Sequence, residues 1–253
     1  MINVLITGMN GLIGGILKEQ LESEGGYNIS SLQRSNVDGA NNFQGDIADI
    51  ESIRPAFVNQ DVVVHLAAHL GDSEWSSHLQ SNIIGTFNVF EAARLEGVKR
   101  VVFASSGRAA SGFERMKPYS DIISGNYPEV PTGFQKVTGQ MVRPEGLYGA
   151  VKAWGEGLAC HFADAYQMSM NCVRIGLVRP VDRPTDARSK SVHVSHRDIG
   201  RFFQKCIDAP ERVNYEILFA TSKNKWSYRD ISAAKEIIGF EPLDSADDFE
   251  IET

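Results

Sequence analysis

The sequence lacks the features that mark membrane, disulfide-rich secreted and nucleic-acid-binding proteins. No segment approaches the roughly 20 consecutive apolar residues that a membrane-spanning helix needs, so we expect no membrane partner. Three cysteines, far apart in the chain, form neither an obvious disulfide framework nor a metal-ligand pattern. The formal net charge is −7 and no basic run is present, which predicts no nucleic-acid partner.

The N-terminal residues also lack the pattern of a secretory signal. Met1 to Gly8 has no positively charged flank and only a short apolar stretch. His161, His193 and His196 share no metal-like spacing with carboxylates or cysteines, so we expect no metal site. Together these absences predict a cytoplasmic protein that acts on a small molecule.

Short β-branched runs alternate with helical patterns along the 253 residues, of which 42% are hydrophobic. Such alternation is typical of an α/β fold, with a doubly wound, Rossmann-type parallel sheet covered by helices on both faces. Ligands of these sheets bind at the carboxyl ends of the strands. The strands expected from the pattern are 2–7, 27–33, 43–46, 61–66, 100–105 and 170–175, and long helices are expected at 79–96 and 147–165.

Two stretches depart from this rhythm and suggest a domain division. Residues 107–146 hold four prolines and little periodicity, which favours an inserted lid or binding loop. Residues 177–253 are mixed and more polar. We therefore predict a dinucleotide-binding domain at 1–176, interrupted by the inserted loop, and a small substrate-binding lobe at 177–253.

A glycine-rich turn follows the first strand and opens the first helix. Glycines at this point allow a tight turn, close approach of the backbone to a pyrophosphate, and close packing of helix on strand. The helix N-terminus adds free N–H donors and the positive end of the helix dipole. The spacing is G-x-x-G-x-x-G, and its position after a first strand predicts a dinucleotide site made by Gly8, Asn10, Gly11, Leu12, Ile13 and Gly14.

The residues after the second strand indicate which nicotinamide cofactor binds. NAD-binding proteins place a carboxylate there for the ribose 2′-hydroxyl, whereas NADP-binding proteins use arginine for the 2′-phosphate. This chain has Arg34 and Ser35, with no carboxylate until Asp38. The pattern favours NADP over NAD, although Arg34 as a solvated charge, or stacked on adenine, would leave NAD binding possible. Asp46 and Ile47, after the third strand, are expected to meet the adenine.

A tyrosine and a lysine stand at i and i+4 near the start of the helix expected at 147–165. Tyr148 and Lys152 therefore share one helix face, and Ser106 follows a strand that ends at the same edge of the sheet. Hydride transfer to or from an alcohol needs a group that exchanges the hydroxyl proton. A tyrosine does this near neutral pH when an adjacent ammonium lowers its pKa, and a serine hydroxyl can hold the substrate oxygen.

With these motifs in place, the chain resembles the extended short-chain dehydrogenases, the NAD-dependent epimerase/dehydratase family, over nearly its whole length. Within that family it is most similar to uronate dehydrogenases. The resemblance rests on the glycine turn, His65-Leu-Ala-Ala68, Ser81-Asn82-Ile-Ile-Gly-Thr86, Val102-Phe-Ala-Ser-Ser106, Glu145-Gly-Leu-Tyr-Gly-Ala-Val-Lys152, Val173-Arg-Ile-Gly176 and Ser195-His196.

The resemblance implies roles for several residues. Tyr148 would be the general base, Lys152 would orient the nicotinamide ribose, and Ser106 would position the substrate oxygen. Arg188 would fall where uronate dehydrogenases hold the substrate carboxylate. The two long helices resemble the pair that forms a four-helix bundle in homodimers of the family. The residues implied to line the middle of the cofactor are Leu66, Ala67 and Ala68.

Several positions depart from the uronate dehydrogenase pattern. Gly107-Arg108 replaces an Asn-His pair, Leu177 replaces a serine, and Leu70 stands where a polar contact is expected. The acidic residue after the second strand is absent, and the segment between Ser106 and Tyr148 is longer. A more apolar substrate than a free uronic acid is therefore a possibility that the sequence leaves open.

The leading hypothesis is an NAD(P)-dependent dehydrogenase or reductase that acts on a small, sugar-derived hydroxyl or carbonyl compound. A sugar-nucleotide epimerase or dehydratase is the second hypothesis, although the small C-terminal part disfavours it. The third is a cofactor-sensing protein without turnover, which would have no need of the proton-transfer group at Tyr148.

Overall fold

The computed structural model, which describes residues 1–36, 38–72 and 74–251, contains one parallel sheet of seven strands in the order β3-β2-β1-β4-β5-β6-β7. The reversal of strand order between β1 and β4 creates the crevice in which doubly wound folds bind ligands. The predicted fold class is confirmed. The strands are β1 (Ile2–Thr7), β2 (Tyr27–Gln33), β3 (Asn41–Gln44), β4 (Val62–His65), β5 (Arg100–Ser106), β6 (Ser169–Ile175) and β7 (Tyr215–Ala220).

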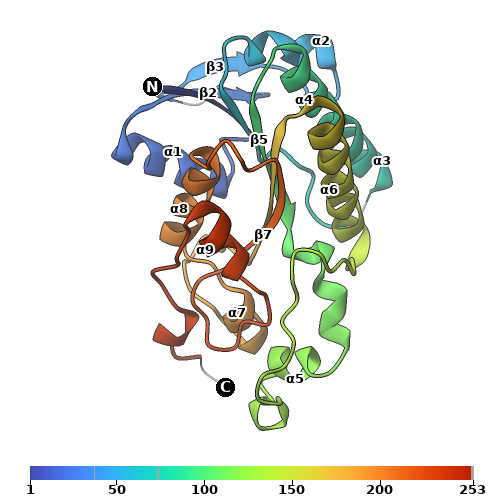
Figure 1. Cartoon of the computed structure of the whole chain (residues 1–253), viewed down its shortest axis with the longest axis vertical. Helices are drawn as coiled ribbons and strands as arrows, with labels where there is room; N and C mark the ends of the chain where they lie inside the picture. Colours follow the sequence, from blue (N-terminus) through green and yellow to red (C-terminus); the bar gives the residue numbers. More distant parts are fainter. Residues whose placement is uncertain (37, 73, 252–253) are drawn as a thin grey trace.

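Helices cover both faces of the sheet (Figure 1). No helix of the described residues is long and apolar enough to cross a membrane. One face is covered by α1 (Leu12–Glu24), α8 (His196–Ile207) and α9 (Ser232–Ile238), and the other by α2 (Ile50–Ile53), α4 (Gly85–Leu95) and α6 (Gly146–Tyr166).

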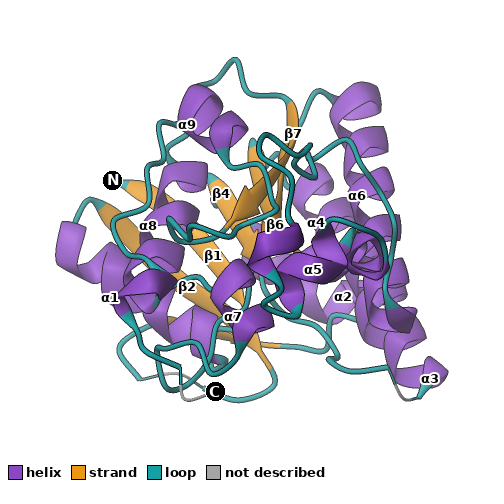
Figure 2. Ribbon diagram, turned by 90° about the horizontal axis from the view of Figure 1, so that it is seen from below, coloured by secondary structure: helices purple, strands orange, loops and turns teal. Residues whose placement is uncertain are grey.

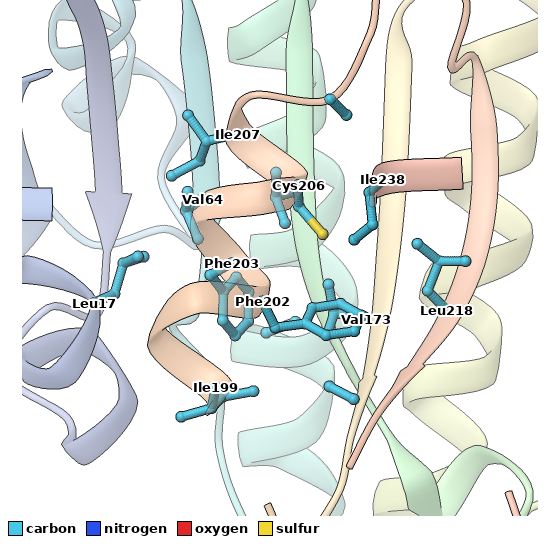
Figure 3. Close-up of a cluster of buried hydrophobic side chains, with 14 of the residues drawn as sticks. Leu17, Val64, Val173, Ile199, Phe202, Phe203, Cys206, Ile207, Leu218 and Ile238 are labelled. Atoms are coloured by element: carbon cyan, nitrogen blue, oxygen red, sulfur yellow. The ribbon is translucent and has the colours of Figure 1, made fainter. Parts of the chain in front are cut away.

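Helix α8 supplies much of the core on the first face. Figure 3 shows Phe202 and Phe203 between the helix axis and the strands, with Val64 of β4 and Val173 of β6 nearby. Both phenylalanines are fully buried. Apolar residues three and four apart share one helical face, so the spacing within α8 explains why it lies flat on the sheet.

Two of the expected elements differ in detail. The third strand ends at Gln44, two residues earlier than predicted, so that Asp46 and Ile47 lie in the connection that follows it. The helix expected at 79–96 is divided into α3 (Trp75–Ser77), a π-helix at His78–Ile84, and α4. A π-helix has a wider turn than an α-helix and often marks a functional position.

The domain division also differs from the boundary predicted at residue 176. Strand β7 pairs in parallel with β6, and α8 packs in the core beside α1, so both belong to the main sheet. The sequence analysis missed β7, an edge strand whose residues Tyr-Glu-Ile-Leu-Phe-Ala are mostly apolar.

The lobe over the carboxyl edge is built from two parts of the chain. The segment 107–146 is structured, with α5 (Tyr119–Ile123), and packs on residues after β6 that include α7 (Ala187–Val192). Figure 2 shows α5 and α7 together in front of the strand ends. Their shared cluster includes Tyr119, Ile122 and Val192. The inserted segment and the C-terminal part therefore form one lobe.

A buried ion pair joins α6 to β6. The Arg174 guanidinium donates to both carboxylate oxygens of Glu156 at 2.8 Å, and the two side chains are 0% and 3% exposed. The Ser105 hydroxyl donates to the same carboxylate, and Arg174 also donates to the Met141 carbonyl at 2.8 Å. One ion pair thus connects β5, β6, α6 and the inserted segment.

We predict that Glu156→Ala lowers the free energy of unfolding by about 3–5 kcal/mol, because it leaves the Arg174 charge buried without a partner. Urea unfolding followed by circular dichroism measures this. The half-exposed pair of Lys18 and Glu22 is the matched control, since Glu22→Ala should cost less than about 0.5 kcal/mol. Similar costs for the two variants would contradict the prediction.

Candidate active site

The glycine turn after β1 has the close contacts that a dinucleotide-binding turn requires. Gly8 adopts a φ of +73°, and a Cβ on it would lie 2.8 Å from the Ala67 nitrogen. A Cβ on Gly14 would lie 2.5 Å from the Cα of Met9. Neither position has room for a side chain. The backbone of the turn therefore lies close to the residues after β4, which neighbours β1 in the sheet, and it can also approach a ligand closely.

The N-terminus of α1 is left open by this turn. Its N-cap residue is Gly11, and no side chain caps the helix. The amide groups of Leu12, Ile13 and Gly14 lie in its first turn, where the helix leaves N–H donors without intrahelical partners. The side-chain-free cradle and these donors fit the pyrophosphate of a dinucleotide.

The residues expected to select the cofactor lie beside the turn. The Asn10 amide side chain donates to the Ser35 hydroxyl at 2.9 Å, and the Asn10 backbone N–H donates to the Gln33 side chain at 3.0 Å. The side-chain nitrogen of Gln33 is buried and has no hydrogen-bond partner among the described residues. Arg34 is exposed and forms no ion pair within the described part of the chain. A polar, partly unsatisfied surface therefore borders the predicted ribose position.

Two further groups of predicted cofactor residues lie along the same crevice. The Thr7 hydroxyl accepts from the Ala67 N–H at 3.1 Å, and the Leu66 N–H donates to the Thr7 carbonyl at 3.2 Å, so Leu66 to Ala68 run beside Gly8. On the other side, the Ile47 carbonyl accepts from Asn88 of α4 at 2.8 Å. The Asp46 carboxylate accepts from the backbone N–H of Ala48 at 3.0 Å.

Ser106 and Tyr148 come from different elements that meet at the carboxyl edge. Ser106 is the last residue of β5, and its hydroxyl accepts from the Arg108 N–H at 3.1 Å. Tyr148 lies in the first turn of α6, which packs against the short helix at Gly107–Ala109. A Cβ on Gly149 would overlap the Arg108 carbonyl, so glycine permits this close approach.

Lys152 lies one turn further along α6, beneath Tyr148. The side chain is 3% exposed, and its ammonium donates to the Ala104 carbonyl at 2.7 Å. The Lys152 nitrogen is 5.6 Å from the centre of the Tyr148 ring and 4.8 Å from that of Phe103. The structure thus places Lys152 beneath Tyr148, and the helix that carries both packs against the short helix that follows Ser106.

Burial dominates the acid–base properties of this pair. It raises the pKa of Tyr148 to about 12, although the nearby Arg108 charge acts in the opposite direction. It lowers the pKa of Lys152 to about 7, although Glu156 acts in the opposite direction. Near neutral pH, Tyr148 therefore retains its proton, and burial disfavours the charged form of Lys152. The lowering of the Tyr148 pKa expected from an adjacent ammonium is not found, because burial raises this pKa and the charge that opposes the rise is that of Arg108.

The π-helix holds the loop after β4 in place. The Asn82 side chain accepts from the His69 N–H at 2.8 Å and donates to the His69 carbonyl at 2.9 Å. The His78 ring contacts that of His69 edge to face and lies 6.3 Å from that of Tyr148. Asn82 therefore positions the backbone of this loop through both polar atoms of its side chain.

His65 is a core residue rather than a ligand. Its ring bonds with the hydroxyls of Thr7 at 2.8 Å and Thr86 at 3.3 Å. Burial lowers its pKa to about 3, so the imidazole is neutral. No group of three or more histidine, cysteine or acidic side chains within the described ranges could hold a metal ion.

Arg108 joins three segments around Tyr148. Its guanidinium donates to Asp72 at 2.7 Å and lies 3.8 Å from Glu145. Asp72 also accepts from the Tyr148 N–H at 3.1 Å, and its bonds to that N–H and to Arg108 keep the pKa of its carboxyl low. The Gly107-Arg108 departure from the uronate dehydrogenase pattern thus introduces an ion pair beside the catalytic helix.

A cavity of about 350 Å³ opens beside Ser106, between the sheet edge and the lobe. Arg188 lines it, but Glu114 already binds its guanidinium with two hydrogen bonds, of 2.6 and 3.1 Å. Leu177, which stands where a serine was expected, lines the same cavity. The full set of lining residues is Ser106, Gly107, Arg108, Glu145, Ile175, Gly176, Leu177, Arg188, Val192 and Arg229.

Sequence reasoning missed Asp72, Glu114, Glu145 and Arg229 at this site. Each lies in an irregular segment or in the first residues of a short helix, where no periodic pattern marks a direction. Their positions depend on how the inserted segment folds against the C-terminal part. Glu145, a charged residue that closely precedes Tyr148 in the sequence, is the one of the four that a motif could have pointed to.

Known proteins share both the sequence and the fold of this chain. A "NAD-dependent glucose-6-phosphate dehydrogenase" from Haloferax volcanii is 30% identical over 98% of this chain and 96% of its own length. An "L-arabinose 1-dehydrogenase (NAD(P)(+))" from the same organism is 25% identical over 97% and 98%. The uronate dehydrogenase of Agrobacterium tumefaciens, in a mutant form complexed with NAD, has a TM-score of 0.83 and 29% identity over 98% of this chain and 87% of that one.

The family model agrees with these relatives and confirms the resemblance that the motifs indicated. It spans residues 4–185, which include the glycine turn, Ser106, Tyr148 and Lys152. On this match, the chain belongs to the NAD dependent epimerase/dehydratase family.

Proposed function

We propose that this protein is an NAD(P)-dependent oxidoreductase that oxidises a hydroxyl group, or reduces a carbonyl group, of a small sugar-derived substrate. The observation that carries the proposal is the position of Lys152 beneath Tyr148 on α6, a helix that packs against the residues directly after Ser106 at the end of β5. Dehydrogenases of sugars and uronates are among the relatives that match nearly the whole chain. The small lobe offers a cavity of about 350 Å³, which suits a single sugar.

Each of the three residues has a distinct task in this proposal. The cofactor, held at the glycine turn, accepts or supplies hydride when bound. Tyr148 exchanges the hydroxyl proton of the substrate, and Ser106 donates a hydrogen bond to the same oxygen. Lys152 holds the nicotinamide ribose, and in its protonated form it would stabilise the phenolate that results when Tyr148 gives up its proton. The high pKa of Tyr148 in the free protein keeps a proton available for the reduction direction.

We also propose that the cofactor is NADP in preference to NAD. Arg34 is exposed at the end of β2 without an acidic partner among the described residues, and Ser35 lies beside Asn10. A guanidinium pairs well with a 2′-phosphate, and no carboxylate stands at this strand end to repel it. The two dehydrogenases from Haloferax volcanii are named as NAD-dependent and as NAD(P)-dependent, so they do not indicate which cofactor this chain prefers. The proposed preference therefore rests on Arg34 and Ser35.

A homodimer completes the proposal. Phe87 of α4 and Trp154 of α6 are 45% and 39% exposed on the outer face of these neighbouring helices. Exposed aromatic residues on adjacent helices are typical of a helix–helix interface between subunits. The cytoplasmic location expected from the sequence stays a prediction.

Tyr148→Phe tests the central proposal. Removal of the phenol should lower kcat for net cofactor turnover by about 100- to 10,000-fold, because proton transfer loses its partner. Absorbance at 340 nm with a panel of aldoses, uronates and sugar phosphates measures this, while a fluorescence titration shows that NAD(P)H binding is retained. Tyr166→Phe, at the exposed end of the same helix, is the matched control and should keep full activity.

The outcomes of this test separate the competing functions. Product formation without net cofactor change would indicate an epimerase. Tight cofactor binding with no turnover of any compound would indicate a cofactor sensor. Equal activity of Tyr148→Phe and the unmodified protein would refute the proposed role of Tyr148.

Arg34→Ala tests the cofactor preference. The dissociation constant for NADPH should rise about 10- to 100-fold, as expected for the loss of hydrogen bonds to a charged group, and that for NADH should change less than about 2-fold. Fluorescence titration gives both constants. Arg212→Ala, at an exposed position near the start of β7, is the control. An unchanged constant for NADPH would refute the NADP preference.

Phe87→Asp tests the homodimer. Light scattering should give the mass of two chains for the unmodified protein and of one for the variant, because a buried carboxylate opposes association. Glu91→Ala, on the same helix, is the control for general effects on α4. A single-chain mass for the unmodified protein would refute the dimer.

A further inference from the structure

The substrate cavity contains a buried arginine that the motifs do not account for. Arg229 follows β7, where the chain returns to the lobe, and its side chain lines the cavity together with Ser106 and Gly107. The residue is 3% exposed. A charged group so far from water is costly unless a partner of opposite charge or several hydrogen bonds compensate it.

Arg229 has almost no such compensation in the described part of the chain. Its Nε and Nη1 atoms are buried without a hydrogen-bond partner. Its Nη2 atom donates only to the Tyr228 hydroxyl, at 3.4 Å. No carboxylate of the described residues lies within 4.0 Å of it, although the guanidinium packs over the rings of Phe219 and Tyr228 at 5.5 and 5.4 Å. Aromatic rings favour a cation but leave its N–H donors unused.

The residue after Ser106 makes room for this guanidinium. A Cβ on Gly107 would overlap the Nη and Cζ atoms of Arg229. The guanidinium therefore lies directly against the backbone next to Ser106. The glycine that replaces asparagine at position 107 is thus required by the position of Arg229, since any larger residue there would displace the guanidinium.

The other two arginines of the cavity are already neutralised. Glu114 binds the Arg188 guanidinium through both oxygens, and the Tyr228 hydroxyl also donates to Glu114. Arg108 is paired with Asp72 and lies near Glu145. Among the described residues, Arg229 is therefore the guanidinium of the cavity that has no carboxylate partner.

We propose that Arg229 binds an anionic group, a carboxylate or a phosphate, on the sugar substrate and so determines its specificity. This inference rests on the proposed function, because it assigns the chemical class of the substrate at the same site. The bound oxyanion supplies the acceptors that the Arg229 N–H groups lack. The role that the resemblance implied for Arg188 passes in large part to Arg229, since Arg188 is engaged by Glu114.

Arg229→Gln tests this assignment by turnover of three sugars that differ in charge: glucose, glucuronate and glucose 6-phosphate. For the anionic sugar that the unmodified protein prefers, KM should rise about 10- to 100-fold with kcat within about 3-fold, as for a lost hydrogen bond to a charged group. The kinetic constants for glucose should change less than about 3-fold. An equal loss for the neutral and the anionic sugars would overturn the inference and leave the proposed function intact.

The matched control is Arg212→Gln, which removes the same guanidinium at an exposed position near the start of β7. Its ratio of kcat/KM for anionic over neutral sugar should stay within about 3-fold of the unmodified protein. Arg188→Gln is the competing test, because Arg188 lines the same cavity. A loss of discrimination in that variant, with none in Arg229→Gln, would overturn the inference and assign the anion to Arg188 instead.

A binding measurement separates this inference from the proposed function. Isothermal titration of the unmodified protein with glucuronate, glucose 6-phosphate and inorganic phosphate should detect at least one anion, and Arg229→Gln should lose that binding. This result would stand even if none of the sugars were turned over. Absence of binding for all three anions, or equal binding by the variant, would overturn the inference.

A nuclear magnetic resonance readout covers the case in which Arg229→Gln fails to fold. The Nε–H signal of Arg229 in the ¹⁵N-labelled unmodified protein, identified by its absence in Arg229→Lys, should shift on titration with the same anions. The Nε–H signal of the exposed Arg212 serves as the internal control. No shift of the Arg229 signal at saturating anion would overturn the inference.

Discussion

The buried ion pair of Glu156 and Arg174 is the interaction on which the geometry of the active site depends. It joins α6 to β6, and through Ser105 and the Met141 carbonyl it also reaches β5 and the inserted segment. Lys152, one turn earlier on α6, bonds to the carbonyl of Ala104 on β5. Glu156 and Lys152, on two neighbouring turns of α6, thus both form hydrogen bonds with β5, the strand that ends in Ser106. A buried ion pair contributes little net stability but tolerates few alternative arrangements, which suits a site that needs accurate positions.

The cofactor side and the substrate side of the site have different physical origins. On the cofactor side, close backbone packing at Gly8 and Gly14 leaves α1 open at its N-terminus, and short-range sequence is enough to specify it. On the substrate side, the inserted segment 107–146 folds against the chain that follows β6. Arginines and carboxylates from these distant segments meet in one cavity. The turn that fits a dinucleotide therefore depends on local sequence, whereas the cavity depends on contacts between distant segments.

Much of the fold and of the catalytic centre could be predicted because local patterns report local structure. The ranges of β1 and β2 match the predicted strands, and Tyr148 and Lys152 lie on the helix that their spacing indicated. The π-helix at His78–Ile84 could not be predicted, since it depends on bonds between Asn82 and the distant backbone of His69. Edge strand β7 is mostly apolar but stands between polar segments, and only its pairing with β6 shows that it belongs to the main sheet.

The sequence by itself determined the alternation of strands and helices, the glycine turn, and the spacing of Tyr148 and Lys152. These features depend on residues that are close in the chain, where side-chain periodicity and backbone freedom act directly. Only the tertiary structure decided that Arg188 is paired with Glu114, that Gly107 leaves space for the Arg229 guanidinium, and that burial raises the pKa of Tyr148. Charge compensation and desolvation depend on contacts between residues that are distant in the sequence, and a local sequence pattern does not specify such contacts.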